Sequence, residues 1–195
     1  MTPDEQTVPA WLRLLLATPG IVAAGIWGVA EGSFFFIVPD LIISLAALYA
    51  PRRALRHMLA VVVGSLVAGA ALYLWSAVDH DRALAAVRHV PFIAHGMFAS
   101  VSSDIASLGA WALCKGPLSG IPYKVYAVLS PGAIPLYLFL LVSIPARLER
   151  LIVSWVVFSC AGMVLKRPLL RHPALGPGLH GLYWVIVYAL YWSRI

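Results

Sequence analysis

Charged residues are scarce in this chain of 195 residues: they make up 11% of it, against about 25% in a soluble domain. Hydrophobic residues account for 62%, and the mean hydropathy is +0.89. The chain also lacks any polar insert large enough to fold by itself. These values exclude an ordinary soluble domain and predict a single integral membrane domain over 1–195.

Cysteine and recognisable catalytic motifs are scarce as well. Cys114 and Cys160 lie in apolar surroundings without CxxC or histidine-rich spacing, so we expect neither a metal site nor a disulfide framework. No GxSxG, P-loop, GxGxxG or HExxH motif occurs. No nucleophile–base pair is visible either. We therefore expect a protein that is not an enzyme and binds no cofactor.

The positive charges lie in short clusters at the ends of apolar segments, where they orient a membrane protein. The net charge of +6 is therefore no sign of nucleic-acid binding. The first ten residues are polar and acidic and lack the basic start of a signal peptide, so no cleaved leader is expected. We expect 1–19 to lie at the membrane interface.

The stretch 27–49 is apolar except for Glu31 and Asp40. A lone carboxylate in lipid costs roughly 2.5–3.5 kcal/mol, so each acid needs a partner, a proton or water. Pro39 disfavours one straight helix, and 41–50 is too short to span a bilayer. Broken helices at membrane depth survive only where protein or a wet cavity covers the backbone. The stretch therefore predicts two half-length helices that meet at a polar pocket.

The later apolar segments repeat this theme. Residues 58–78 read as the clearest spanning helix, and the three prolines of 125–146 predict a second broken element. We expect a charged connection over 147–150 and then a separate helix over 151–165. The predicted fold is an all-α integral membrane protein: an inverted repeat of two re-entrant helical hairpins plus flanking transmembrane helices, the last within 173–195.

The basic clusters pose a conflict of topology. If 52–57 and 147–150 are both cytoplasmic, single crossings place 166–171 on the opposite side, against the positive-inside tendency. Either 151–165 does not cross fully, or the first assignment is wrong.

Both halves contain short motifs built around a break. The pattern is an acid, a break at proline, an apolar half-helix and a glycine-containing helix that ends in an aromatic residue. The motifs are Glu31, Pro39-Asp40-Leu41-Ile42, Gly64-Ser65 through Gly69 to Tyr73, Gly120-Ile121-Pro122-Tyr123-Lys124 and Ser143 through Arg150. They resemble the DedA family, which shares a domain with eukaryotic VTT (SNARE-associated Golgi-type) proteins, in its Pro-Tyr-Lys branch. The resemblance covers 20–165.

This resemblance implies two re-entrant hairpins that enter from opposite sides, in a multi-pass protein of the bacterial cytoplasmic membrane. It also implies lipid handling, either flipping of polyprenyl phosphate or scrambling of phospholipid, with proton coupling. Glu31 and Asp40 match the family's embedded acids, and Lys124 matches its second basic residue. The first basic residue of the pattern falls on Leu118 here. Lys115 is the remaining candidate, which leaves the phosphate site and the lipid undefined.

The acids have two interpretations when they are considered by themselves. Burial and a nearby second acid disfavour the charged form of a carboxyl group, so Glu31 and Asp40 could carry a proton. Asp40 could instead cap the second half-helix by accepting a backbone N–H, and the two roles are compatible.

The bases are similarly open to two interpretations. Lys115 and Lys124 flank the second break, where they could bind phosphate or extend to the interface as anchors. Arg147 and Arg150 are three residues apart and could grip one phosphate together. A basic helix cap is an equally simple interpretation of Arg150.

We therefore expect a transporter of a phosphate-bearing lipid, with membrane lipids and protons as partners, no nucleic acid, and a homo-oligomer left open. In that case Lys124 and Arg147 face Glu31 and Asp40 across one cavity. The alternatives are a proton-coupled carrier or exporter of small solutes and a non-catalytic factor in membrane assembly or homeostasis.

Overall fold

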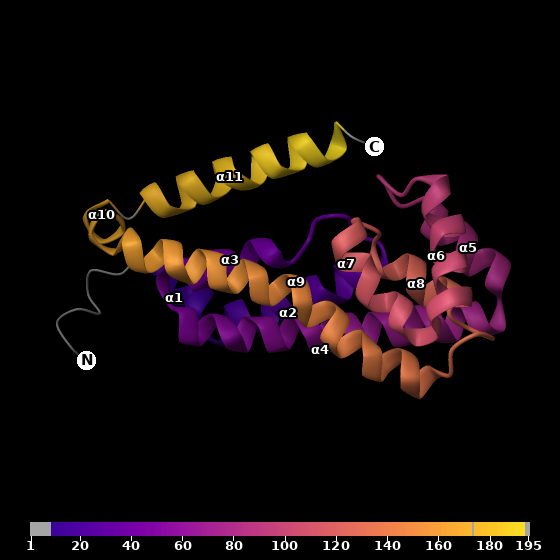
Figure 1. Ribbon diagram of the computed structural model, residues 1–195. Helices are drawn as coiled ribbons and strands as arrows, with labels where there is room; N and C mark the ends of the chain where they lie inside the picture. The colour runs from indigo at the N-terminus through magenta and orange to yellow at the C-terminus, as the bar shows by residue number, and fades with distance from the viewer. Residues whose placement is uncertain (1–8, 173, 194–195) are drawn as a thin grey trace.

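The computed structural model describes residues 9–172 and 174–193, so the start of the expected interfacial segment and residues 173 and 194–195 lie outside the described part. The described chain is all-helical (Figure 1). Its elements are α1 (Ala10–Leu16), α2 (Thr18–Ser33), α3 (Asp40–Tyr49), α4 (Pro51–Val78), α5 (His80–Arg88), α6 (His95–Leu108), the 3-10 helix η2 (Gly109–Lys115), α7 (Gly116–Ser119), α8 (Tyr123–Leu129), α9 (Leu136–Val164), α10 (Lys166–Arg171) and α11 (Leu175–Trp192).

Two helical stretches in the described chain are long and apolar enough to cross a membrane: α4, and α6 with η2 over His95–Lys115. The pair α1 and α2, bent by 62°, makes a third if it is taken as one span. These stretches indicate a membrane protein, and α4 confirms the helix predicted over 58–78. The C-terminal helix forms as α11, while its passage through a membrane stays a prediction.

The first broken element doubles back on itself. Glycines pack α2 against α4 in the same direction: a Cβ at Gly25 would lie 3.8 Å from that of Ala60, and one at Gly32, further along α2, would lie 2.8 Å from that of Ala68, further along α4. Between these contacts, a Cβ at Gly28 would lie 2.4 Å from the carbonyl oxygen of Val61. Small residues permit such close backbone approach between helices. Because α2 and α4 run in parallel from the same end, the short α3 between them must run back.

The second broken element lies beside α4 in the same way. Ser76 donates a hydrogen bond to the carbonyl oxygen of Val128 in α8, at 2.7 Å, and Tyr73 donates one to that of Ile134, also at 2.7 Å. After the turn at Ile134, α9 returns along α4. Near its end it packs closely against α3, since a Cβ at Gly162 would lie 2.1 Å from the carbonyl oxygen of Leu48.

The structure corrects the prediction for 147–165. One helix, α9, runs through Pro145 and the charged residues to Val164, so 147–150 is not a connection and 151–165 is not a separate helix. The chain turns back earlier, over 130–135 between α8 and α9. The charges can lie within a helix because carboxylates from the first half of the chain neutralise them, as described below.

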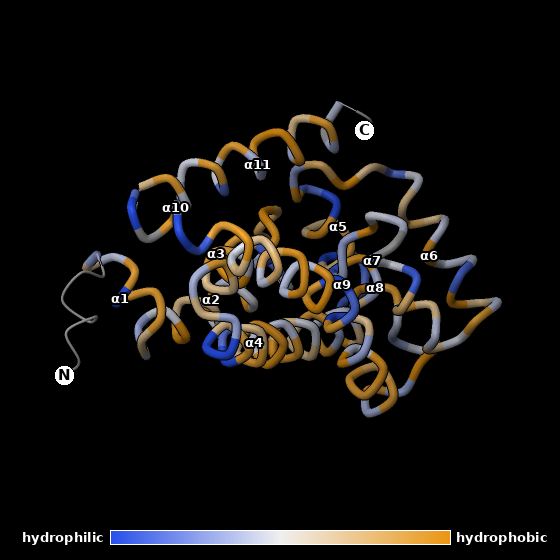
Figure 2. The backbone as a smooth tube through the Cα atoms, turned by 60° about the vertical axis from the view of Figure 1, so that its left-hand side comes forward, coloured by the Kyte–Doolittle hydropathy of each residue, from blue (hydrophilic) through white to orange (hydrophobic). Residues whose placement is uncertain are grey.

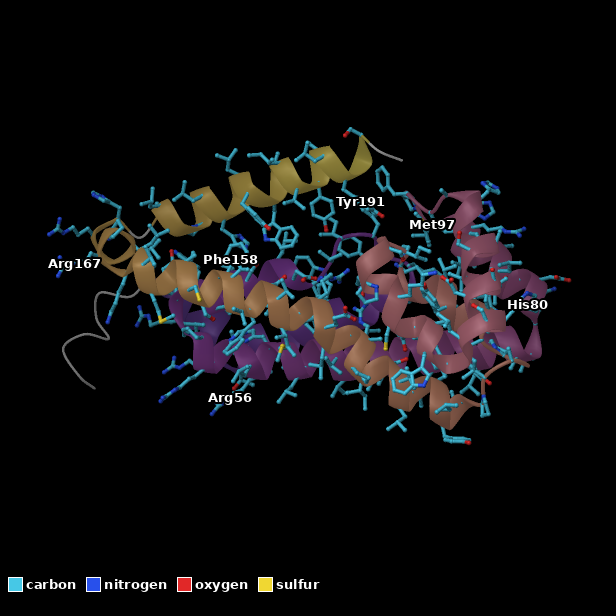
Figure 3. All side chains as sticks on the ribbon, viewed as in Figure 1. Arg56, His80, Met97, Phe158, Arg167 and Tyr191 are labelled. Carbon is cyan, nitrogen blue, oxygen red and sulfur yellow. The ribbon has the colours of Figure 1, made fainter. Side chains whose placement is uncertain are left out.

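The same correction removes the conflict of topology. Because α9 traverses the length of the protein, 166–171 lies at the same end as 52–57. The indole Nε1 of Trp155 donates a hydrogen bond to the carbonyl oxygen of Pro51 at 2.9 Å, which ties the two regions together. Arg56 and Arg167 lie at one end of the molecule and His80 lies at the other (Figure 3).

Candidate functional site

A cavity of about 330 Å³ lies between two breaks in the helices and α11. The first break is 34–39, between α2 and α3, and the second is 120–122, between α7 and α8. Its charged lining comes from four helices, α2, α3, α8 and α9. Aromatic and aliphatic side chains from α11 and from the segment 90–93 form much of the remaining wall. The charged lining residues are Glu31, Asp40, Lys124, Arg147 and Arg150.

Glu31 and Arg147 form a buried ion pair in the cavity lining. Glu31 lies in the last turn of α2, and Arg147 lies in the middle of α9. The Arg147 guanidinium also donates a hydrogen bond to Ser65 Oγ at 3.0 Å and stacks over the Tyr123 ring at 5.2 Å. Since these side chains are 4% and 7% exposed, the interaction takes place away from bulk water.

Asp40 and Arg150 form a second pair beside the first. Arg150 Nη2 lies 2.9 Å from Asp40 Oδ2, and Ser154 Oγ donates a hydrogen bond to Asp40 Oδ1 at 2.7 Å. The cap of α3 is Pro39, and no side chain makes a capping hydrogen bond there, so the capping interpretation of Asp40 is wrong. Arg147 and Arg150 each hold their own carboxylate in this arrangement.

Lys124 differs from the two arginines. It lies in the first turn of α8 and is 1% exposed. Its Nζ donates a hydrogen bond to the carbonyl oxygen of Phe35, in the first break, at 2.7 Å. Among the described residues it has no ion pair within 4.0 Å. The cavity thus carries three cationic side chains and two carboxylates, an excess of one positive charge.

Lys115 is separate from this group. It pairs with Asp104 at 2.6 Å, its side chain is 55% exposed, and it does not line the cavity. The structure therefore brings together five of the six residues selected from the sequence. Lys115 is the sixth, and its place matches the anchor interpretation better than a cavity role.

Sequence reasoning missed the contribution of α11. The amide of Val38, in the first break, donates a hydrogen bond to the Tyr188 hydroxyl at 2.7 Å, and the Tyr191 hydroxyl donates one to the carbonyl oxygen of Gly120, at the second break, at 3.0 Å. From the sequence, both tyrosines look like aromatic residues that lie at the membrane–water interface. The signal that could have identified them is spacing, since Trp184, Tyr188 and Tyr191 share one helical face.

No group of three or more His, Cys, Asp or Glu side chains within the described ranges could hold a metal ion. The arrangement is instead suited to holding an anion. Beside an apolar wall, it has two buried cations and the half-buried Arg150, and one of the buried cations, Lys124, has no carboxylate within 4.0 Å among the described residues. Comparison with protein-family models, curated proteins and solved structures gives no match to this chain.

Proposed function

We propose that this protein is a membrane lipid transporter, of flippase or scramblase type, for a lipid with a phosphate headgroup such as polyprenyl phosphate or phospholipid. The headgroup occupies the cavity, and the hydrocarbon chain remains in the bilayer. Several of the residues in which the chain resembles DedA and VTT-domain proteins, among them Glu31, Asp40 and Lys124, line this cavity.

The observation that carries the proposal is the state of Lys124. A buried charge without a directly paired counter-ion is expensive, so a fold retains one mainly where a ligand supplies the opposite charge. An anionic headgroup would bring that charge next to Nζ. Lysine serves well as a point charge for phosphate, and its Nζ–H groups beyond the one given to Phe35 provide donors.

The ion pairs provide a role for protons within the same proposal. A proton on Glu31 would release Arg147 toward the cavity, because a neutral carboxyl group no longer balances the guanidinium. Protonation of Asp40 would do the same for Arg150. Anion binding would then be linked to proton uptake, since each event favours the other.

We further propose that the two broken elements are re-entrant hairpins related as an inverted repeat, in a multi-pass protein of the bacterial cytoplasmic membrane. The doubling back of α2 and α3 supports this proposal for the first half. The position of Glu31, Asp40 and Lys124 beside the two breaks agrees with the expected location of a transporter site at a repeat interface.

The test uses purified protein in phosphatidylcholine vesicles that contain a trace of fluorescent phosphatidylglycerol, with dithionite quenching as the measure of lipid movement. Lys124→Met is expected to lower the rate by about 10- to 100-fold, the loss that corresponds to one charged hydrogen bond. Lys115→Met is the matched control, because that lysine lies outside the cavity, and its rate should stay within about twofold of the parent.

Two results would overturn the proposal. One is full activity of Lys124→Met in a variant that remains monodisperse and folded. The other is uptake of radiolabelled inorganic phosphate into the vesicles without lipid movement, which would indicate a carrier of small solutes.

A further inference from the structure

We propose that α11 is a lateral gate, whose displacement opens the cavity to the bilayer. This inference rests on the proposed function, because a lipid whose hydrocarbon chain stays in the membrane must reach the cavity from the side. The helix lies along one side of the molecule (Figures 1 and 2) and lines the cavity with Tyr183, Trp184, Val187, Tyr188 and Tyr191.

The packing of α11 is shallow compared with that of the other cavity walls. Among its described side chains and glycines, only Gly176, His180 and Trp184 are buried. Elsewhere, helices approach so closely that a Cβ at Gly64 or Gly162 would collide with a neighbouring backbone. A wall that buries little surface separates at a lower free-energy cost than one whose backbones are in contact.

A few polar contacts hold the gate closed. Tyr188 accepts a hydrogen bond from the first break, at Val38, and Tyr191 donates one to the second break, at Gly120. One helix therefore joins the two broken elements that surround the site. A neutral hydrogen bond of ordinary strength corresponds to about a fivefold change in an opening equilibrium, so these contacts can be broken individually.

A third contact cluster fixes the other half of α11. Trp184 Nε1 donates toward His180 Nε2 at 3.1 Å and toward Ser44 Oγ at 3.2 Å, while Ser44 Oγ lies 2.8 Å from the same His180 nitrogen. These side chains are buried, whereas Tyr188 and Tyr191 are less so. The N-terminal half is therefore the anchored part, and the C-terminal half, with the two tyrosines, is the part that swings.

The experiment locks the gate with a cross-link. Ser119, next to the second break, and Tyr191 are replaced by cysteine in a chain whose Cys114 and Cys160 are serine, and a short bifunctional methanethiosulfonate joins them. Lipid movement in the vesicles described above should fall at least tenfold, and a reductant should restore it. A rate that the cross-link leaves unchanged would overturn the gate.

A matched control separates gating from rigidity in general. Gly25→Cys and Ala60→Cys join α2 to α4, where the Cβ atoms would lie 3.8 Å apart, within the range that a disulfide requires. These helices are packed by backbone contact, so their disulfide should leave transport within about twofold. Equal inhibition by both cross-links would show a requirement for flexibility rather than a gate at α11.

A second measurement does not depend on transport. Ala146→Cys places a thiol on the cavity wall, and its reaction with lipid-soluble N-phenylmaleimide reports how often the cavity opens to the bilayer. The cross-link between positions 119 and 191 should slow the reaction at least tenfold, and Tyr191→Phe without a cross-link should accelerate it by about fivefold.

This measurement distinguishes the two proposals. If the parent protein moves no lipid but the cross-link still slows maleimide labelling, the transport function fails and the gate stands. If neither the cross-link nor Tyr191→Phe changes the rate at which maleimide labels the thiol, the gate proposal is rejected, whatever the transport result.

Discussion

The two ion pairs of the cavity, of which Glu31–Arg147 is buried on both sides, join residues that are far apart in the sequence. Glu31 pairs with Arg147, and Asp40 pairs with Arg150. The desolvation of such charges is repaid only when the partner and the remaining hydrogen bonds are in place. Each pair therefore fixes the first broken element against the middle of α9, beside the cavity.

Glu31→Gln is expected to destabilise the protein by about 3–5 kcal/mol, because it leaves Arg147 buried without its counter-ion. SDS titration in mixed micelles measures the free energy of unfolding. The double variant Glu31→Gln/Arg147→Met should recover most of the loss, since it removes both charges.

The exposed pair of Asp79 and Arg82 provides the comparison for this cycle. Their side chains are 37% and 83% exposed, and the Arg82 Nε to Asp79 Oδ2 distance is 3.3 Å. Arg82→Met should change the free energy of unfolding by less than about 1 kcal/mol. A loss for Glu31→Gln no larger than this would show that Arg147 finds compensation elsewhere.

At the level of elements, the packing of α2 against α4 rests on glycines that leave no room for a side chain. A Cβ at Gly64 would lie 2.2 Å from the carbonyl oxygen of Gly25 and 3.0 Å from the amide nitrogen of Val29. Because both obstacles are backbone atoms, the helices would have to separate to accept it. This separation would also shift Glu31, which lies further along α2.

Gly64→Ala is therefore expected to destabilise the fold by about 1–3 kcal/mol, even though alanine favours a helix more than glycine does. Thermal unfolding in detergent tests this expectation. Gly96→Ala is the control, since a Cβ there meets nothing within 4 Å. The control should leave the melting temperature unchanged or raise it, and a similar fall in both variants would contradict the packing argument.

How much of these elements the sequence predicts depends on the range of the interactions involved. The break at Pro39 and the helix over 58–78 follow from local rules of proline geometry and hydropathy, and both are present. The continuity of α9 does not follow from local rules. The charged segment 147–150 looked like a connection between two helices because its counter-ions, Glu31 and Asp40, lie more than a hundred residues earlier in the chain.

The range of the interactions also decides which residues of the candidate site the sequence predicts. Lys124 and the acids could be selected because charged residues in apolar segments stand out. Tyr188 and Tyr191 do not stand out by residue type, because a tyrosine near the end of an apolar helix is ordinary and their partners are backbone groups of distant breaks. Only their spacing along one helical face sets them apart. Lys115 satisfied the same sequence criterion as Lys124, but its side chain is directed to Asp104.

The whole molecule is electrically polar along its length. The start of α4 and helix α10 bring basic residues to one end, where α10 stands out as hydrophilic next to the hydrophobic α11 (Figure 2). The opposite end, in and before α5, carries no such excess, because two acidic residues there are balanced by Arg82 and Arg88. The basic residues are Arg52, Arg53, Arg56, Lys166, Arg167 and Arg171, and the acidic ones are Asp79 and Asp81.

This polarity predicts the orientation in the membrane. Lysine and arginine are retained on the cytoplasmic side, so α10 and the start of α4 should face the cytoplasm, and α5 should face the opposite compartment. In a chain whose Cys114 and Cys160 are serine, His80→Cys should react with a membrane-impermeant maleimide added to intact cells. Arg167→Cys should react only after the membrane is permeabilised.

The two labels must give opposite answers, because α4 runs the length of the protein between the ends that they mark. Labelling of both sites from outside would mean that α4 does not cross the membrane, and the cavity would then have no bilayer around it. Labelling of position 167 alone would invert the orientation. In that case the end with α5 would face the cytoplasm, and the charges within α9 would remain where they are, because Glu31 and Asp40 rather than the membrane potential hold them there.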